Sequence, residues 1–301
     1  MAHNALDNLS IDYTDEIVAS LPHPPGPVIR STGATTVLDD RQDTVERLCN
    51  ADFIIDLSIE GLMHSRATAQ LLGSGARIQN ISQEHPEILA RMAPQLEDMA
   101  PVRQAVKLLR GAHQMQVRSR SGTALAISLK EAISVGVWGW TDKPGTLAHW
   151  PGGLVVSFPA AGSVNGTLVL APGDVNLTFK RYMESAVKLK IANDYIVDIE
   201  GDGADARLME NYLQGFNEKD AYATSHVGWG MNTRARYESM TMYDKQDFNG
   251  TEMRALAGNF LYSTGANEFA NRFTRGHFDL PVFDCDIIID GQAVVQNGDL
   301  L

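Results

Sequence analysis

The 301-residue chain is 44% hydrophobic and 21% charged, enough to bury a large core and to form two domains. Lys and Arg number 25 against 37 Asp and Glu, and the resulting net charge of -12 excludes nucleic acid and anionic membranes as expected partners. The first residues, MAHNALDNLSIDYTDE, lack the basic and apolar regions of a secretory signal, and no stretch is long and apolar enough to cross a bilayer. We therefore expect a cytoplasmic protein.

The chain has two cysteines, Cys49 and Cys285, which are too few for a disulfide framework or a thiolate metal cluster. Cys285 begins an apolar strand pattern and has no His beside it in the sequence, so we expect it to be buried by packing. Any metal site must therefore use His and carboxylate ligands.

The first part of the chain alternates between strand and helix patterns. The expected elements are a capped helix over Asp40–Cys49, strands over Asp52–Leu57 and Ala76–Ser82, and helices over Pro86–Ala100 and Val102–His113. This alternation predicts an open α/β domain over residues 1–113 with some parallel strand pairing.

From Gln114 onward the pattern becomes β-rich. The expected strands are QVRSRS, GTALAISL, GGLVVSFP, GTLVLAP, and AVKLKI with YIVDIEG around an Ala-Asn-Asp turn. A helix over Ala204–Gln214 interrupts them, and CDIIID-GQ-AVVQNG predicts a terminal hairpin with a two-residue turn. The predicted fold class is α/β, with an N-terminal open α/β domain followed by a β-rich α+β catalytic domain over residues 114–301.

A glycine-rich segment, Gly201-Asp-Gly203-Ala-Asp-Ala206, partly matches the dinucleotide-binding fingerprint between a strand and a helix. Asp202 and Asp205 would place negative charge where a pyrophosphate needs bare backbone donors. The same side chains interact favourably with the start of a helix. We interpret the segment as a structural turn.

Metal-ligand chemistry is predicted for two segments. On a strand, His277 and Asp279 point to one face while Phe278 points to the other. His226 lies in an uncharged, glycine-rich and aromatic segment, SHVGWGMN, which is an unusual setting for a solvent-facing imidazole. Two His and one carboxylate form a facial triad that leaves open positions on Fe(II), and the same set can hold catalytic zinc. Spacing does not choose between the two metals.

A family resemblance extends this hypothesis. The segments HWPGGLVVSFPAAGSVNGTLVL, YIVDIEGDGADARLMENYL, SHVGWGMN, GNFLYSTGANE and GHFDLPVFDC occur in this order, with GLMHS at Gly61–Ser65 further upstream. They resemble the 2,5-dihydroxypyridine 5,6-dioxygenases, which open the ring in bacterial nicotinate breakdown. That family is built on the scaffold of the thermophilic aminopeptidases of the AmpS type.

The resemblance implies that His226, His277 and Asp279 are the ligands of one Fe(II). It also implies that the enzyme uses dioxygen to cleave a small aromatic N-heterocycle, 2,5-dihydroxypyridine or a close hydroxypyridine, between C5 and C6. The product would be N-formylmaleamate. We also expect a homo-oligomer.

The chain departs from the aminopeptidase pattern at two positions. Those enzymes resemble this sequence through a Gly-Glu pair where this chain has Gly153-Leu154, and they carry a His in the region of Gly258–Tyr262. Leu154 and Leu261 therefore stand where two metal ligands would be expected, and leucine cannot coordinate a cation. A second metal is predicted to be missing, and one divalent ion with one carboxylate suits an anionic ligand.

Two further histidines are expected near the substrate. His64 follows a predicted strand at the edge where an open α/β sheet presents its active-site loops, and the resemblance implies that it contacts the substrate and acts as a base. His149 precedes the strand that carries Leu154 and is a second acid/base or hydrogen-bond candidate. For each of the two, a structural hydrogen-bonded role is the alternative.

The remaining aromatic candidates have weaker signals. Trp150, Trp229 and Phe278 would either line a flat pocket or pack in the core, and core packing is the default. No role is assigned to His3, His23, His85 and His113.

Two other functions remain open on the sequence alone. One is a mononuclear metallohydrolase that kept a peptidase activity, and the other is a catalytically silent binding protein with the same fold. Metal content together with oxygen uptake would separate all three.

Overall fold

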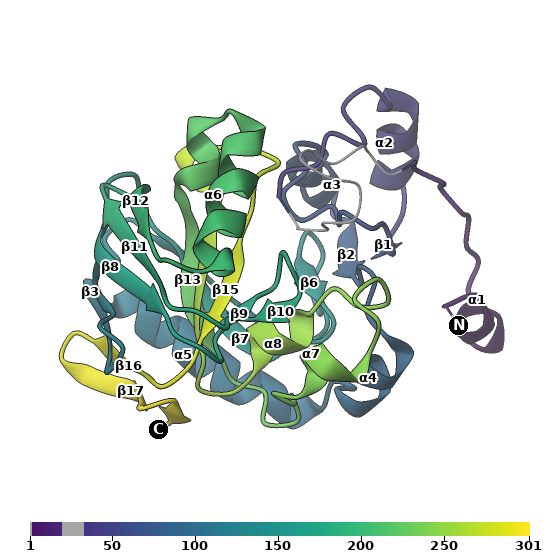
Figure 1. Cartoon of the computed structure of the whole chain (residues 1–301). Coiled ribbons are helices and arrows are strands. Elements are labelled where there is room, and N and C mark those ends of the chain that lie inside the picture. The colour runs from purple at the N-terminus through teal and green to yellow at the C-terminus, as the bar shows by residue number, and fades with distance from the viewer. Residues whose placement is uncertain (1, 20–32) are drawn as a thin grey trace.

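The structure is a computed structural model that describes residues 2–19 and 33–301 (Figure 1). Its helices are α1 Ala2–Asn8, α2 Gln42–Cys49, α3 Ala67–Gly73, α4 Pro86–Arg91, α5 Met99–Gly111, α6 Ala204–Phe216, α7 Ser239–Met242 and α8 Thr251–Ala255, with short 3-10 helices η1 Leu96–Asp98, η2 Lys219–Tyr222 and η3 Glu268–Ala270. Within these described ranges, no helix has the length and apolar character that a bilayer crossing requires.

A three-stranded parallel sheet forms the N-terminal part. Its strands are β1 Phe53–Asp56, β2 Arg77–Asn80 and β6 Leu147–His149, in the order β1-β2-β6. The predicted parallel pairing is confirmed, because both pairs in this sheet are parallel. Strand β6 comes from beyond residue 113 and pairs with β2, while the domain boundary near His113 stays a prediction.

An eight-stranded antiparallel sheet and a five-stranded sheet form the rest. The larger sheet has the order β12-β11-β8-β4-β3-β16-β17-β18, with β3 Gln114–Ser119, β4 Ala124–Ser128, β8 Val164–Leu170, β11 Val187–Ala192, β12 Tyr195–Glu200, β16 Cys285–Ile289, β17 Gln292–Gln296 and β18 Asp299–Leu300. The smaller has the order β15-β14-β13-β7-β5, with β5 Ile133–Val137, β7 Leu154–Phe158, β13 Thr224–Gly230, β14 Phe260–Thr264 and β15 Asp279–Val282. A small ribbon joins β9 Val175–Asn176 to β10 Arg181–Tyr182. The predicted α/β class is confirmed.

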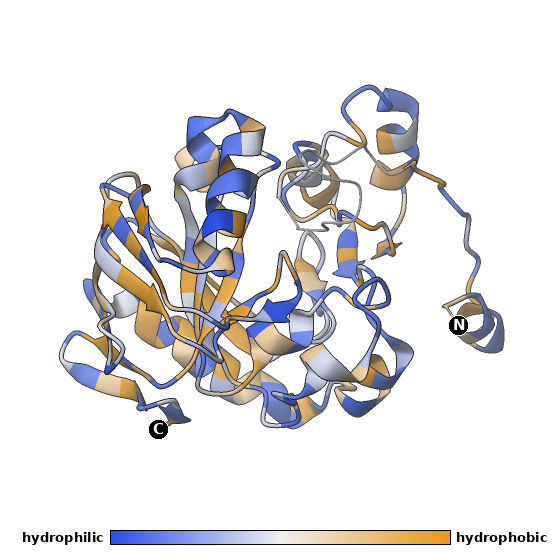
Figure 2. Cartoon of the chain, viewed as in Figure 1, coloured by the Kyte–Doolittle hydropathy of each residue, from blue (hydrophilic) through white to orange (hydrophobic). Residues whose placement is uncertain are grey.

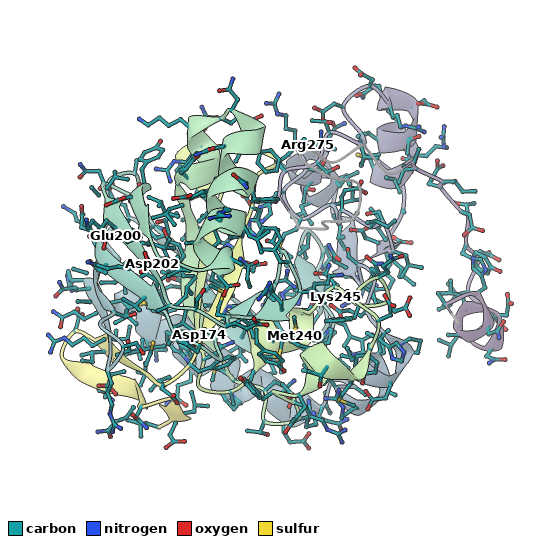
Figure 3. The ribbon with its side chains drawn as sticks, viewed as in Figure 1. Asp174, Glu200, Asp202, Met240, Lys245 and Arg275 are labelled. Atoms are coloured by element: carbon teal, nitrogen blue, oxygen red, sulfur yellow. The ribbon has the colours of Figure 1, made fainter. Side chains whose placement is uncertain are left out.

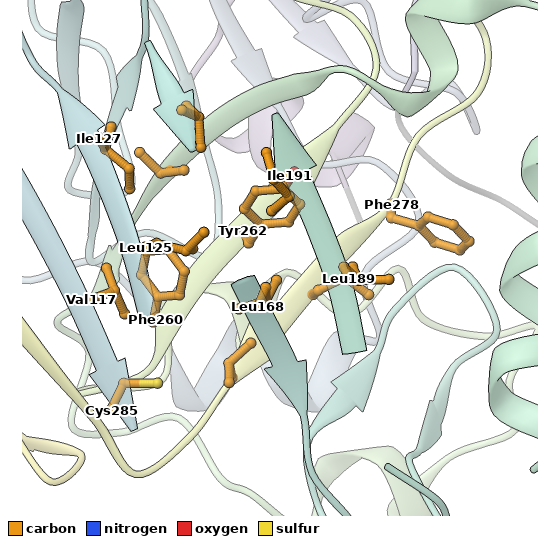
Figure 4. Close-up of a cluster of buried hydrophobic side chains, with 14 of the residues drawn as sticks. Val117, Leu125, Ile127, Leu168, Leu189, Ile191, Phe260, Tyr262, Phe278 and Cys285 are labelled. Atoms are coloured by element: carbon orange, nitrogen blue, oxygen red, sulfur yellow. The ribbon is translucent and has the colours of Figure 1, made fainter. Parts of the chain in front are cut away.

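The main core lies between these two sheets. Val117, Leu125, Leu168 and Leu189 of the eight-stranded sheet pack with Phe260 of β14 in one buried cluster (Figure 4). The hydropathy colouring shows the same division, with apolar strands inside and polar residues on α6 and the outer turns (Figure 2). Cys285 is fully buried in this core, as predicted.

Three local predictions were wrong in detail. The helix expected over Pro86–Ala100 breaks after Arg91, because Pro94 cannot continue it. Helix α2 begins at Gln42 rather than Asp40, and its N-cap residue, Arg41, makes no side-chain capping bond. The C-terminal hairpin turns at Asp290-Gly291, one residue earlier than expected, since these two residues have the positive φ values, 45° and 88°, that a tight two-residue turn requires.

The glycine-rich segment before α6 has a structural role, as interpreted. Asp205 accepts hydrogen bonds from the backbone N–H groups of Glu184 and Ser185, each at 2.9 Å. A Cβ atom on Gly203 would lie 2.0 Å from Ser185 Oγ, so only glycine fits there. Asp202 is exposed beside the start of α6 (Figure 3).

Candidate active site

The five-stranded sheet has two chemically different faces because neighbouring residues on a strand point in opposite directions. Trp229 and Phe260 belong to the buried core shared with the larger sheet. The opposite face carries His226, Ser263 and Asp279, and a cavity of about 720 Å³ is lined by His226 and Asp279 among others. The candidate site therefore lies on the face that points away from the main core.

A β-bulge places His226 on this face. Thr224 pairs with Thr264 and Val227 pairs with Tyr262, so β13 contains one residue more than β14 between these pairs. Such a bulge re-aims the side chains beside it. Val227 remains in the core, while His226 points toward the cavity with 9% of its surface exposed.

His277 and Asp279 meet His226 as the alternation predicted. Asp279 opens β15 opposite Ser263, and Phe278 between the two ligand candidates is fully buried in the core. His277 Nε2 lies 3.1 Å from Asp279 Oδ2. His226 Nε2 lies 3.7 Å from Asp279 Oδ1, and the two imidazole centroids are 6.0 Å apart.

The tautomer of His226 is set by a hydrogen-bond chain. The Ser225 hydroxyl donates to the carbonyl of Ala266, so its oxygen is left to accept the Nδ1–H of His226 at 3.0 Å. The Nε2 lone pair then faces Asp279. Burial lowers the pKa of His226 to about 3, which the Asp279 carboxylate only partly offsets, so the imidazole is neutral at physiological pH.

Asp279 is ionised because of a residue that the sequence did not reveal. Arg254 of α8 donates from Nε to Asp279 Oδ2 at 2.5 Å, and its Nη1 is held by Asn249 Oδ1 at 3.0 Å. Ser263 Oγ donates to the other carboxylate oxygen. Burial acts to raise the pKa of Asp279, but the charge of Arg254 and the neighbouring His277 outweigh it and hold that pKa well below its usual range.

His64 lies beside this group although it comes from the N-terminal sheet. Asp56 stabilises the loop after β1, because its carboxylate accepts a hydrogen bond from the backbone N–H of Leu62 at 2.7 Å. The His64 ring is 97% buried, and its centroid lies 6.4 Å from that of His226 and 6.0 Å from that of His277. The three rings thus surround one small volume.

Glu268 of η3 is a second residue that sequence reasoning missed. Its Oε2 lies 3.1 Å from His64 Nδ1. Burial acts to raise the pKa of Glu268, but the hydrogen bond and charge of His64 bring it below its ordinary value. An ionised Glu268 accepts the Nδ1–H of His64, which leaves the Nε2 of that ring as the nitrogen with a free lone pair.

His149 also borders the cavity, at the end of β6. Its Nδ1 lies 2.6 Å from the carbonyl of Pro151 and donates to it, so Nε2 is again the accepting nitrogen. Burial lowers the pKa of His149 to about 4, and the nearby Arg254 acts in the same direction. At neutral pH this ring is an uncharged hydrogen-bond acceptor.

Leu154 and Leu261 line the cavity with 3% and 1% of their surface exposed. They lie on the same face of the sheet as His226 and Asp279 and contribute only apolar surface there. The missing second metal stays a prediction.

His226, His277 and Asp279 offer donor atoms whose chemistry suits a divalent metal ion. A neutral imidazole and an ionised carboxylate are the forms that bind a metal, and nitrogen with oxygen donors suit Fe, Mn or Zn. Among residues 2–19 and 33–301, no three His, Cys, Asp or Glu side chains already have a metal-binding arrangement. Arg254 and Ser263 each donate a hydrogen bond to one oxygen of Asp279, and each oxygen keeps a further lone pair.

The other aromatic and histidine candidates have structural positions. Trp229 and Phe278 pack in the core, whereas Trp150 lines the cavity and donates from Nε1 to the carbonyl of Met92 at 3.0 Å. His85 caps α4 by accepting from the backbone N–H of Glu87. His3 pairs with Asp15, His113 is exposed beside Asp290, and His23 lies outside the described residues.

Comparison with known proteins decides the family. The profile of the NicX family, described as 2,5-dihydroxypyridine 5,6-dioxygenase, matches residues 1–301. This chain belongs to that family. A 2,5-dihydroxypyridine 5,6-dioxygenase from Pseudomonas putida KT2440 is 38% identical over 253 residues, which are 83% of this chain and 71% of the relative.

Solved structures agree with this assignment. The structure titled 2,5-dihydroxypyridine dioxygenase from Pseudomonas putida KT2440 superposes with a TM-score of 0.93 at 35% identity, covering 100% of this chain and 86% of the other. Wild-type AmpT from Thermus thermophilus superposes with a TM-score of 0.53 at 11% identity, covering 78% of each chain. The second match shows that the dioxygenase family shares its fold with AmpT.

Proposed function

We propose that this ring-cleaving dioxygenase acts on 2,5-dihydroxypyridine or a close hydroxypyridine and opens the ring between C5 and C6 to give N-formylmaleamate. The observation that carries the proposal is the convergence of His226, His277, Asp279 and His64 beside a largely apolar cavity. Such a cavity admits a flat heterocycle and supplies few but well-placed polar groups.

His226, His277 and Asp279 are the proposed ligands of one Fe(II). When bound, a ferrous ion supplies the redox chemistry that dioxygen requires, whereas zinc has no accessible redox step. Each ligand has its own support: Ser225 orients His226, the Asp279 carboxylate is anchored by Arg254 and Ser263, and the backbone carbonyl of His277 accepts from Thr178 at 2.9 Å. Supported ligands hold an ion in a defined geometry.

His64 is the proposed base for the 5-hydroxyl proton. Its Nε2 has the free lone pair, and the Glu268 carboxylate on Nδ1 stabilises the imidazolium that forms when Nε2 takes the proton. His149 has a different proposed role, because a ring whose pKa is about 4 is a weak base at neutral pH. Its Nε2 would accept a hydrogen bond from the substrate and orient the ring.

A metallohydrolase is the second candidate, since the fold is shared with AmpT. Leu154 and Leu261 argue against it, because leucine offers no metal ligand at these two positions. Labelled dioxygen separates the two mechanisms. We expect both labelled atoms in the ring-opened product, apart from later exchange with water, whereas label only from water or turnover under argon would favour the hydrolase.

We also propose a cytoplasmic homo-oligomer. Leu9 and Ile17 of the N-terminal segment are 69% and 88% exposed, and this segment extends away from the body of the chain (Figure 1). Apolar side chains in such an arm are typical of contacts between subunits. Light scattering after size-exclusion chromatography tests the proposal, and a monomer at micromolar concentration would contradict it.

A further inference from the structure

The cavity has a second, outer region whose charge is opposite to that of the chain as a whole. Arg103, Lys107, Arg110 and Lys143, hereafter the outer basic cluster, line it together with one carboxylate, that of Asp142. The inner end holds Asp279, Glu268 and Arg254, which pairs with Asp279. In a chain with a net charge of -12, four cations around one cavity mouth form a local site of positive potential.

Helix α5 supplies most of the outer basic cluster. Arg103, Lys107 and Arg110 are spaced by four and three residues, so they share one face of the helix. Val102 and Leu109 of the same helix are buried, with 1% of their surface exposed. The helix is thus fixed by its apolar residues and presents its cations to the cavity.

The cations of the outer basic cluster are not all neutralised. Arg103 pairs with Asp142 at 2.8 Å and stacks over the ring of Trp138. Arg110 donates to the carbonyl of Ser134 at 3.1 Å and 3.2 Å, which leaves its charge uncompensated. Within the described part of the chain, the ammonium groups of Lys107 and Lys143 have no hydrogen-bond or ion-pair partner.

Trp138 adds an independent sign of a binding surface. It lines the cavity, and its buried indole Nε1–H has no acceptor among the described residues. A buried donor without an acceptor is costly unless a ligand or a water completes it. An anion or a water that reached this N–H would complete it.

We infer that the outer basic cluster and Trp138 form a binding subsite for a small carboxylate, namely the anionic ring-opened product on its way out. This inference rests on the proposed function. Ring opening adds both atoms of dioxygen to C5H5NO2 and gives C5H5NO4, with C5 as a new carboxylic acid and C6 as the N-formyl group. The acid loses its proton in water, so a neutral ring becomes an anion.

The outer basic cluster then distinguishes product from substrate by charge. The new carboxylate is attracted by Lys107 and Lys143 at the outer end. The neutral substrate is not attracted to the same extent. The outer basic cluster therefore acts on the product more strongly than on the substrate.

The test measures direct binding of maleamate, a small carboxylate of the product type, to the metal-loaded enzyme by anaerobic calorimetry, where no turnover occurs. The double variant Lys107→Gln/Lys143→Gln should weaken maleamate binding at low salt by roughly fivefold or more, and high salt should shrink the difference. Lys130→Gln removes one positive charge from an exposed turn and should leave binding unchanged. Trp138→Phe should weaken binding to a smaller degree.

Equal maleamate affinity in the double variant and in Lys130→Gln would overturn the inference. A hydroxypyridine carboxylate that binds more tightly than maleamate, and loses more in the double variant, would assign the subsite to a substrate substituent and overturn the product assignment. The proposed function fails separately, if the wild-type enzyme consumes no dioxygen with 2,5-dihydroxypyridine while maleamate still binds.

Discussion

The two faces of the five-stranded sheet are built from the same strands but have opposite chemistry. On the core face, Trp229, Phe260 and Tyr262 are at most 2% exposed, and the Tyr262 hydroxyl is satisfied by Thr224 at 2.9 Å. On the cavity face, His226 and Asp279 are also buried, yet they carry a neutral imidazole and an ionised carboxylate. Packing on the core face fixes the backbone of the strands. The cavity face can therefore hold polar groups that would not stay buried on their own.

The largest expected effect comes from removing the cavity-face ligands. His226→Ala and His277→Ala should each abolish iron binding and turnover, because a site with three protein ligands has none to spare. Asp279→Asn should do the same, and it is a gentler change than Asp279→Ala because the amide oxygen can still accept a hydrogen bond from the buried Arg254. Metal analysis and oxygen uptake measure the loss, with circular dichroism as the check on folding.

Full iron occupancy in any one of these variants would remove that residue from the ligand set. The core face should keep each variant folded, because it contributes none of the substituted side chains. An unfolded His226→Ala protein would therefore contradict the separation of the two faces.

The next effect concerns the groups that face the substrate. His64→Ala should keep the metal but lower kcat on the order of a hundredfold, as expected for a lost base. His149→Ala should have a smaller effect, roughly tenfold, because a ring with a pKa of about 4 acts through a hydrogen bond. Glu268→Gln should lower kcat by a smaller factor than His64→Ala, since it removes the charge that stabilises the protonated His64 ring. Unchanged kinetics in any of these variants would show that the substituted residue has only a structural role.

Two milder substitutions should separate the hydrogen bonds that orient the metal ligands from the packing of the core. Ser225→Ala removes the acceptor of the His226 Nδ1–H and should weaken iron binding about tenfold, with little change in stability. Phe260→Leu is the matched control on the core face. It should lower the free energy of unfolding by about 1 kcal/mol and leave iron affinity unchanged. A loss of stability in Ser225→Ala with unchanged iron affinity, or a loss of iron affinity in Phe260→Leu, would contradict the separation of the two faces.

The last expected effect is a pH dependence of stability at Glu84, beside the start of α8. Glu84 accepts the backbone N–H of Thr251 at 3.0 Å, and burial raises its pKa from 4.5 to about 7. The folded chain thus binds more protons than the unfolded chain between these values, so stability should fall as pH rises from 4.5 to 7. Glu84→Gln should remove this slope. Unfolding midpoints at pH 5 and pH 8 measure it, and an equal shift at both pH values would contradict it.

The sequence predicted the part of the site that follows from strand alternation and family resemblance. Asp279 opens β15 and lines the cavity, Phe278 just before it is buried in the core, and His277 Nε2 lies 3.1 Å from the Asp279 carboxylate, as the predicted alternation of side chains requires. The bulge at His226 was not predicted, since it depends on how β13 pairs with β14. Arg254, Ser263 and Glu268 were missed because they contact Asp279 and His64 only after folding, and no local spacing marks such contacts.

The fold, too, could be predicted only in part from the sequence. The parallel pairing of β1 and β2 was predicted from the alternation of strands and helices. Strand β6 is three residues long and joins the sheet from far along the chain, so its pattern is too short to predict. The strand over Ile133–Val137 was missed as well, because it is short and Gly136 weakens its pattern.

His226, His277 and Asp279 should together hold one redox-active ion for chemistry with dioxygen. Reconstitution of metal-free protein with Fe(II) or Zn(II) under argon, followed by addition of substrate and air, tests it most directly. Both ions should bind at about one per chain, because the same donors suit both. Only the Fe(II) protein should then consume dioxygen and open the ring, whereas turnover by the Zn(II) protein under argon would contradict the account.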